Sequence, residues 1–139
     1  MNTPSVCHCI NLRRAAQAIT QLYDDALEPS GLKVTQFSLL QAVRRRGPVS
    51  ISALAEEVQL DRTTLGRNLH VLEREGLVSF APGDDQREHT VRLTDQGKAA
   101  IKAAKPLWEQ AQARVNEMLG KEQLETLTAL LVKVQTVAP

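Results

Sequence analysis

The segment 61–75 carries polar side chains of the kinds that recognise the edges of nucleic-acid bases. An arginine can donate two hydrogen bonds to guanine, an asparagine can pair with adenine, and a threonine can donate, accept or touch a thymine methyl group. The side chains of these kinds are Arg62, Thr63, Thr64, Arg67 and Asn68. The side of the segment that carries them has no carboxylate. We therefore expect this side to enter the major groove of DNA, with Arg62 on the phosphate backbone.

A helix over these residues would gather the polar side chains on one side. The apolar residues that recur at helical spacing are Leu65, Leu69 and Leu72. At about 100° per residue, Thr63 and Arg67 fall opposite these leucines, while Thr64 and Asn68 lie on the flank. Asp61 is a suitable N-cap, because its carboxylate can accept backbone N–H groups at the positive end of the helix.

A shorter helix is expected directly before this one. Ser50 can cap it, since a serine hydroxyl accepts a backbone N–H of the first turn. The apolar residues that follow with the spacing of one buried face are Ile51, Leu54, Ala55 and Val58. Gln59 and Leu60 leave room for a tight turn before the helix that starts at Asp61. Two helices joined in this way predict a helix-turn-helix.

A β-hairpin is expected after the second helix. Gly76 can end that helix, because glycine readily adopts the left-handed conformation of the C′ position. Residues 77–80 and 89–93 have the composition of two short strands, with turn formers between them, so we predict a wing over 77–93. The side chains expected at its tip are Gln86 and Arg87, with Asp85 bracing Arg87. An arginine on a thin tip can reach phosphates or a narrow minor groove.

Residues of the wing form a recognisable pattern with residues that follow it. The pattern D-x-R…LT-x-x-G is made by Asp85, Arg87, Leu93, Thr94 and Gly97. Together with the stretches LKVTQFSLL at 32–40 and SISALAEEVQLDRTTLGRNLHVLEREGLV at 50–78, it resembles the MarR family of winged-helix regulators over essentially the whole chain. The resemblance implies a homodimeric bacterial transcription factor, usually a repressor, whose affinity for double-stranded DNA changes when a small ligand or an oxidant acts on it.

Helical patterns flank this unit, so we expect one domain over 1–139, mainly α with a small β-wing. The winged helix-turn-helix takes 33–94, and the flanking segments 7–29 and 95–137, the latter interrupted by Gly120, carry apolar stripes that the unit does not need. We expect them to bury the same segments of a second copy, since monomers rarely keep such patches exposed. A homodimer would present two reading helices about 34 to 36 Å apart to a pseudo-palindromic operator. The alternative is a monomer with a helical cap.

The composition agrees with a soluble protein. The chain has 139 residues, 42% of them hydrophobic, without an apolar run long enough to span a membrane and without a charged-then-apolar leader. We therefore expect a cytoplasmic protein. The formal net charge of +1 is not a nucleic-acid signature. Every Lys or Arg between Arg44 and Arg92 is nevertheless arginine, whose planar fork suits guanine and phosphate.

Several single residues have simple expected roles. Thr35 is expected to cap a helix at the start of the winged unit. Trp108 and Met118 are expected in the core, Tyr23 is expected to be an interface aromatic, and His89 should be solvated on its strand.

Cys7, His8 and Cys9 lie next to the start of the first helical pattern. Three roles are open for the cysteines: an inert packed or interface thiol, a redox sensor, and a metal or arsenical site. A disulfide between Cys7 and Cys9 would be strained. One chain supplies three soft ligands here rather than a closed tetrahedral set, so we predict no metal and no other cofactor.

Within the resemblance, Cys9 has a counterpart. Counted back from Tyr23 without gaps, Cys9 stands at the place of the reactive cysteine in the organic-peroxide-sensing branch of the family. That branch pairs its cysteine with tyrosines, and Tyr23 matches one of them. Arg13 and Val34 occupy the other two places. The resemblance therefore implies Cys9, together with Cys7 and Tyr23, as a candidate sensor.

Two other classes of function are alternatives to a transcriptional regulator. A winged helix can serve as a protein–protein interaction module without specific DNA binding, and the near-neutral charge agrees with that alternative. A thiol enzyme built on Cys7, His8 and Cys9 would lack the base-and-orienter geometry of nucleophilic catalysis. No paired carboxylates, phosphate loop or metal motif supports an enzyme either, so we do not expect one.

Overall fold

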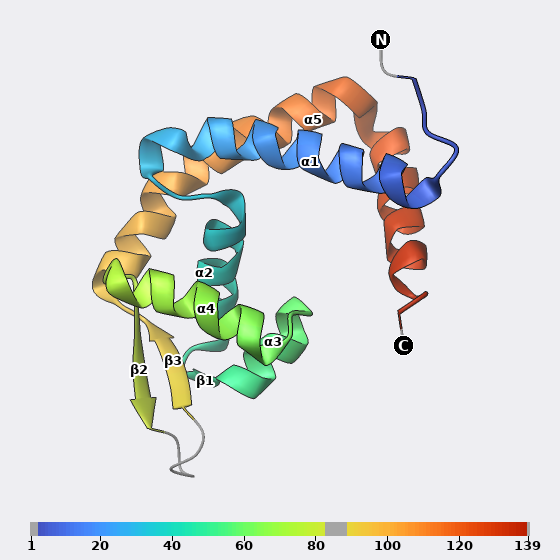
Figure 1. The fold of residues 1–139 in the computed structure, drawn as a ribbon. Helices are drawn as coiled ribbons and strands as arrows, with labels where there is room; N and C mark the ends of the chain where they lie inside the picture. The colour runs from blue at the N-terminus through green and yellow to red at the C-terminus, as the bar shows by residue number, and fades with distance from the viewer. Residues whose placement is uncertain (1–2, 83–88, 139) are drawn as a thin grey trace.

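The computed structural model describes residues 3–82 and 89–138, which are mainly helical. The helices are α1 (His8–Leu27), the short 3-10 helix η1 (Glu28–Ser30), α2 (Val34–Arg46), α3 (Ile51–Val58), α4 (Arg62–Arg74) and α5 (Asp95–Gln135). The strands are β1 (Val49–Ser50), β2 (Val78–Pro82) and β3 (His89–Leu93). Figure 1 shows α1 running alongside α5 at one end of the molecule, while β2 and β3 extend at the other. This is the predicted mainly α fold with a small wing.

Both caps of the helix-turn-helix form as predicted. The Ser50 hydroxyl accepts a hydrogen bond from the Ala53 N–H at 3.1 Å, and a carboxylate oxygen of Asp61 accepts one from the Thr64 N–H at 2.7 Å. Gln59 takes the left-handed conformation, with φ of 58°, at the end of α3. This residue ends α3, and α4 begins three residues later.

Gly76 ends α4 in the way that its position predicts. Its φ is 78°, and its N–H donates to the carbonyl of Glu73 at 2.9 Å. The N–H of Leu77 donates to the carbonyl of Leu72, also at 2.9 Å. These two bonds are the Schellman pattern, which satisfies the last carbonyls of the helix.

The wing belongs to a three-stranded antiparallel sheet with the order β1-β3-β2. Val91 in the central strand pairs with Phe80 of β2 and with Val49 of β1. The strand β1 is an addition to the prediction, since two residues are too few to show an alternating pattern. Pro82 was expected in the turn, but it ends β2 and pairs with His89.

The core lies where α2, α3, α4, the sheet and the first part of α5 meet. Its fully buried large side chains are Leu27, Leu40, Val43, Leu54, Leu65, Leu69, Leu72, Val78, Val91 and Ile101. Trp108 packs against this core, as expected, with its ring 5.9 Å from that of Phe37. The expectation for Met118 was wrong, because 63% of its surface is exposed within the chain. Helical spacing alone does not tell a core face from a face that another molecule covers.

The helix α2 begins at Val34, two residues earlier than a cap at Thr35 would allow. Lys33 is its N-cap residue, and the Lys33 N–H donates to the side-chain oxygen of Gln36 at 2.9 Å. A carboxylate oxygen of Asp24, on α1, accepts a hydrogen bond from the Val34 N–H at 2.8 Å. The prediction of a Thr35 cap was therefore wrong, because α1 supplies the acceptor from a distant part of the chain.

The long helix α5 changes character at Gly120. That residue has φ of 78° and ψ of 165°, so the helix breaks where the sequence pattern predicts. The backbone at Pro106 keeps helical angles. Figure 1 shows the C-terminal part of α5 running in a different direction from the part that lies alongside α1. Among the described helices, none combines the length and the apolar character that spanning a membrane would need.

Candidate nucleic-acid interface

One side of α4 faces solvent and the opposite side is buried. Leu65, Leu69 and Leu72 have no exposed surface, because they pack into the core. The exposed side chains predicted to meet DNA are Arg62, Thr63, Arg67 and Asn68. We call the exposed side of α4 that includes Thr63 and Arg67 the reading face. The buried leucines fix the rotation of the helix and therefore the direction of this face.

The first turn of α4 is held by Asp61 and Thr64. One carboxylate oxygen of Asp61 accepts from the Thr64 N–H at 2.7 Å, and the other accepts from the Thr64 hydroxyl at 2.9 Å. These two hydrogen bonds from Thr64 hold the pKa of Asp61 below its ordinary value, and the charge of Arg67 contributes in the same direction. Because the hydroxyl proton of Thr64 is committed to the cap, Thr64 has only an acceptor lone pair and its methyl group left for a base.

Asn68 lies on the flank of α4 that is turned toward α2. It lines a small cavity of about 150 Å³ together with Lys33 and Gln36, near the start of α2, and with Val71. Its side chain is nevertheless exposed. The structure therefore places Asn68 beside the reading face and not at its centre, in agreement with the flank position predicted from the helical spacing.

The second half of α4 is tied to the wing by His70. The imidazole ring lies 5.4 Å from the ring of Phe80 on β2, and its Nδ1 lies 3.5 Å from a carboxylate oxygen of Glu73. Both ends of the pair with Glu73 are largely exposed, so this pair adds little stability. The contact between the rings sets the position of β2 against the reading helix.

The structure describes the base of the wing, and the tip lies outside the described residues. Arg92 on β3 donates from Nε to the hydroxyl of Ser79 on the neighbouring strand at 3.2 Å. His89 is exposed, as predicted. The tip side chains Asp85, Gln86 and Arg87 belong to the segment 83–88, which the structure does not describe. The contacts expected of them, including the brace between Asp85 and Arg87, stay predictions.

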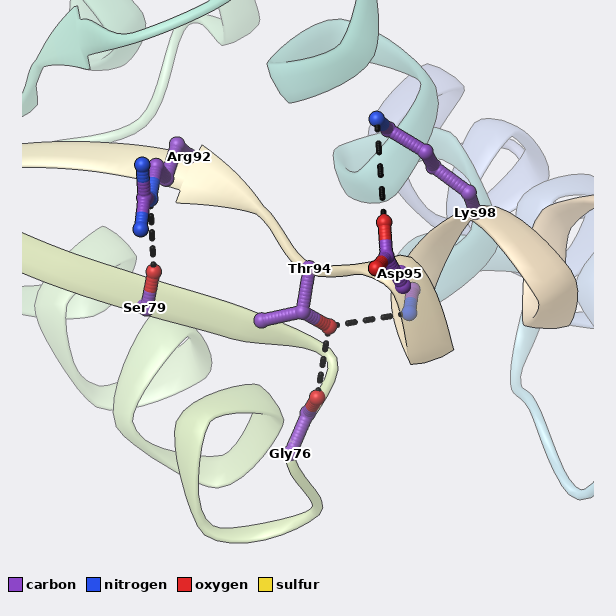
Figure 2. A network of polar contacts seen from close by, with 7 residues as sticks. Gly76, Ser79, Arg92, Thr94, Asp95 and Lys98 are labelled. Carbon is purple, nitrogen blue, oxygen red and sulfur yellow. Dashed lines mark hydrogen bonds and ion pairs between the residues drawn. The ribbon is translucent and has the colours of Figure 1, made fainter.

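Thr94 joins the end of α4 to the start of α5 (Figure 2). Its hydroxyl donates to the Gly76 carbonyl at 2.6 Å and accepts from the Gly97 N–H at 3.0 Å, and its own N–H donates to the Leu77 carbonyl at 3.1 Å. A side chain on Gly97 would collide with the Leu77 carbonyl oxygen and with Leu93. We call this arrangement the Thr94 joint. From the sequence, Thr94 and Gly97 were visible as parts of a motif, but not as the connection between two helices.

The candidate sensor residues do not form one cluster within the chain. Cys7 is the N-cap residue of α1, Cys9 lies in its first turn, and both thiols are free and exposed. Tyr23 lies fourteen residues after Cys9 on the same helix, about 21 Å along the axis. Its hydroxyl donates to the side-chain oxygen of Gln112 on α5, and burial raises the pKa of Tyr23. A single chain therefore keeps Cys9 and Tyr23 apart.

Metal-binding side chains do not gather elsewhere in the described parts of the chain. Across residues 3–82 and 89–138, no group of three or more His, Cys, Asp or Glu side chains is arranged to hold an ion.

Comparison with known proteins agrees with this architecture. The profile of the MarR family matches residues 30–88, which run from the end of η1 into the wing. An uncharacterized HTH-type transcriptional regulator of Bacillus cereus is 30% identical over 126 residues, which make up 90% of this chain and 84% of that protein. The similarity therefore extends well beyond the winged unit into the flanking helices.

Two solved structures show that the similarity extends to the three-dimensional fold. The M. tuberculosis transcriptional regulator MosR, crystallised in complex with DNA, is 40% identical with a TM-score of 0.83, over 94% of this chain and 97% of MosR. A variant of MarR from E. coli, complexed with operator DNA, is 26% identical with a TM-score of 0.82, over 88% of this chain and 89% of MarR. Because sequence and fold agree over nearly the full length of these relatives, the chain belongs to the MarR family of winged helix-turn-helix transcriptional regulators.

Proposed function

We propose that this regulator binds a pseudo-palindromic DNA operator as a homodimer, with α4 in the major groove. The observation that carries the proposal is the division of α4 into a leucine side without exposed surface and an exposed polar reading face. A helix held in this way can meet base edges without losing core contacts. The DNA-bound structures of MosR and MarR support the same use of the fold.

The side chains have distinct proposed roles. Arg67 and Thr63 read base edges from the reading face, Thr64 contributes an acceptor or its methyl group, and Asn68 reads from the flank. Arg62, at the start of the helix, holds the phosphate backbone. Arg87, with Gln86 beside it and Asp85 bracing it, reaches the backbone or the minor groove from the wing.

The second copy is proposed to cover the exposed apolar side chains of α1 and α5. These side chains are Ile10, Leu12, Met118, Leu127, Leu130, Leu131, Val132 and Val134. Leu130 alone leaves 54% of its surface exposed, and most of its exposed apolar neighbours lie on the same C-terminal part of α5. Exposed apolar side chains gathered on one segment in this way favour an interface. The segments 7–29 and 95–137 are thus the proposed dimerisation helices, and two copies would set their reading helices about one DNA turn apart.

Release from DNA is proposed to follow binding of a small ligand or oxidation of a thiol, so that the protein acts as a repressor. Cys9 is the proposed thiol, because it is exposed in the first turn of α1.

The direct test measures binding to a duplex from the region upstream of the gene and to a scrambled duplex of equal composition. By fluorescence anisotropy, Arg67→Ala should lose about 1 to 3 kcal/mol on the operator and little on the scrambled duplex. Arg114→Ala, which removes an exposed arginine of α5, is the matched control and should bind both duplexes like the wild type. Equal losses on the two duplexes would remove base reading from the role of Arg67.

A further inference from the structure

A basic groove runs between the end of α2, the base of the wing and the first turns of α5. It consists of two adjoining cavities that share Arg44 and Lys98. The cavity beside the wing has a volume of about 590 Å³ and reaches Ser79 and Arg92, and the one along α5 has about 730 Å³ and reaches Lys105. Figure 2 shows the Arg92 and Lys98 side of the first cavity.

Positive charge dominates the walls of the basic groove. Its cations are Arg44, Arg92, Lys98, Lys102 and Lys105. Its carboxylates are Asp95 and Glu109. Lys98 lies 4.0 Å from Asp95 with both groups exposed, which neutralises little of the charge. Arg92 donates Nε to Ser79, and this neutral partner orients the guanidinium without cancelling its charge.

The basic groove has the size of a small-molecule site. Each of its two cavities has a volume within the range of about 300 to 1,000 Å³ that is usual for such sites. The apolar side chains of Val43, Leu93 and Ile101 contribute to its lining between the charged groups. No residue of the described helix α4 lines it, so it is separate from the reading face. These features favour a compact ligand over a nucleic-acid duplex.

We propose that the basic groove binds a small, multiply charged anion of the phosphate-ester or polycarboxylate class. Guanidinium groups bind such anions through paired, charge-assisted hydrogen bonds, and ammonium groups add point charges along the groove. Arg44 comes from α2, Arg92 from β3 and Lys98 from α5. One bound anion would therefore contact three elements of the fold at once.

The position of the basic groove links it to the reading helix. Thr94 lines the groove and also donates its hydroxyl hydrogen to Gly76, at the end of α4. An anion that draws Lys98 and Arg92 together would act on both sides of the Thr94 joint. Its effect on operator affinity, which rests on the proposed function, would make the anion an effector of the regulator.

The binding experiment uses inorganic pyrophosphate as the probe. Isothermal titration calorimetry of the full-length protein, at constant ionic strength and without DNA, should show saturable binding. The variant Arg44→Gln with Lys98→Gln should bind at least about tenfold more weakly, a loss of about 1.4 kcal/mol. The control Arg45→Gln with Lys121→Gln removes two exposed cations outside the groove and should bind like the wild type. Absence of saturable binding, or equal weakening in both variants, would overturn the proposal.

A second measurement separates this proposal from the DNA-binding function. Operator affinity is measured with and without pyrophosphate for the wild type and for the Arg44→Gln/Lys98→Gln variant. An anion-dependent change in the wild type that the variant lacks supports the effector role, and an unchanged wild type contradicts it. If the variant binds every duplex more weakly without any anion, the groove holds DNA phosphates and the small-anion proposal fails. Pyrophosphate binding by a protein that binds no DNA would contradict the proposed function alone.

Discussion

Replacing Thr94 with valine is expected to loosen the connection between the reading helix and α5. Valine keeps the size and β-branching of threonine but has no hydroxyl group. The variant therefore loses the hydrogen bond to the Gly76 carbonyl, 2.6 Å long, and the acceptor for the Gly97 N–H, 3.0 Å away. The backbone bond from the Thr94 N–H to Leu77 is preserved. The substitution thus isolates the side-chain part of the Thr94 joint.

The two lost bonds set the size of the effect. Loss of an N-cap side chain costs about 1 kcal/mol. The Gly76 carbonyl is left without its side-chain donor in a half-buried position, which costs about 1 kcal/mol more. The free energy of unfolding should therefore fall by about 2 kcal/mol. Operator affinity should fall as well, because Gly76 directly follows the reading helix.

Urea denaturation at a fixed protein concentration measures the change in stability. The matched control is Thr90→Val on β3, whose hydroxyl makes one long hydrogen bond of 3.4 Å to the Ala81 carbonyl. This control should lose less than about 0.5 kcal/mol. Equal losses in the two variants, or an operator affinity of Thr94→Val equal to that of the wild type at full folding, would refute the role assigned to the joint.

Three further predictions concern the dimer, the thiol and the cap. Leu130→Asp places a charge on the exposed apolar part of α5, so light scattering should show a monomer. The control Lys121→Asp changes another exposed residue of α5 and should stay dimeric. A Leu130→Asp protein that is still a dimer would contradict the proposed interface. The Cys9→Ser variant should still bind the operator, but peroxide should no longer release it from the DNA. The Cys7→Ser variant should keep both operator binding and release by peroxide. If peroxide still releases the Cys9→Ser variant, that thiol has no part in the mechanism. The pKa of Asp61 is lowered by its hydrogen bonds from Thr64, so the cap stabilises the protein above the unfolded-state pKa and is lost as the pH falls through the folded-state value. Below about pH 4, the wild type should lose its stability advantage over Asp61→Ala in urea titrations, and an advantage that stays constant with pH would contradict a charged cap.

The sequence by itself was sufficient for the local features of this protein. Caps at Ser50 and Asp61 and the helix end at Gly76 were predictable, because each depends on a side chain or backbone conformation within a few residues. The bounds of β3 were also predictable from its alternating pattern. The polar face of α4 followed from the helical period, which relates residues only three or four positions apart.

Expectations failed where distant parts of the chain decide the outcome. The start of α2 depends on Asp24 in α1, and the strand β1 exists because Val49 finds a partner in Val91. Met118 has the spacing of a core residue, yet the described parts of its own chain leave 63% of its surface exposed. Periodicity states which side chains share a face, but it does not state what packs against that face.

Only the tertiary structure brought together the Thr94 joint and the basic groove. The hydrogen bond from Thr94 to Gly76 spans 18 residues of the sequence, and the residues that line the basic groove come from α2, β3 and α5, among other segments. Such sites depend on how helices and strands pack, and packing is set by the shape of the whole core rather than by neighbours in the chain. The residue types proposed to contact DNA are therefore visible in the sequence, whereas the contacts that connect α4 to the rest of the molecule are not.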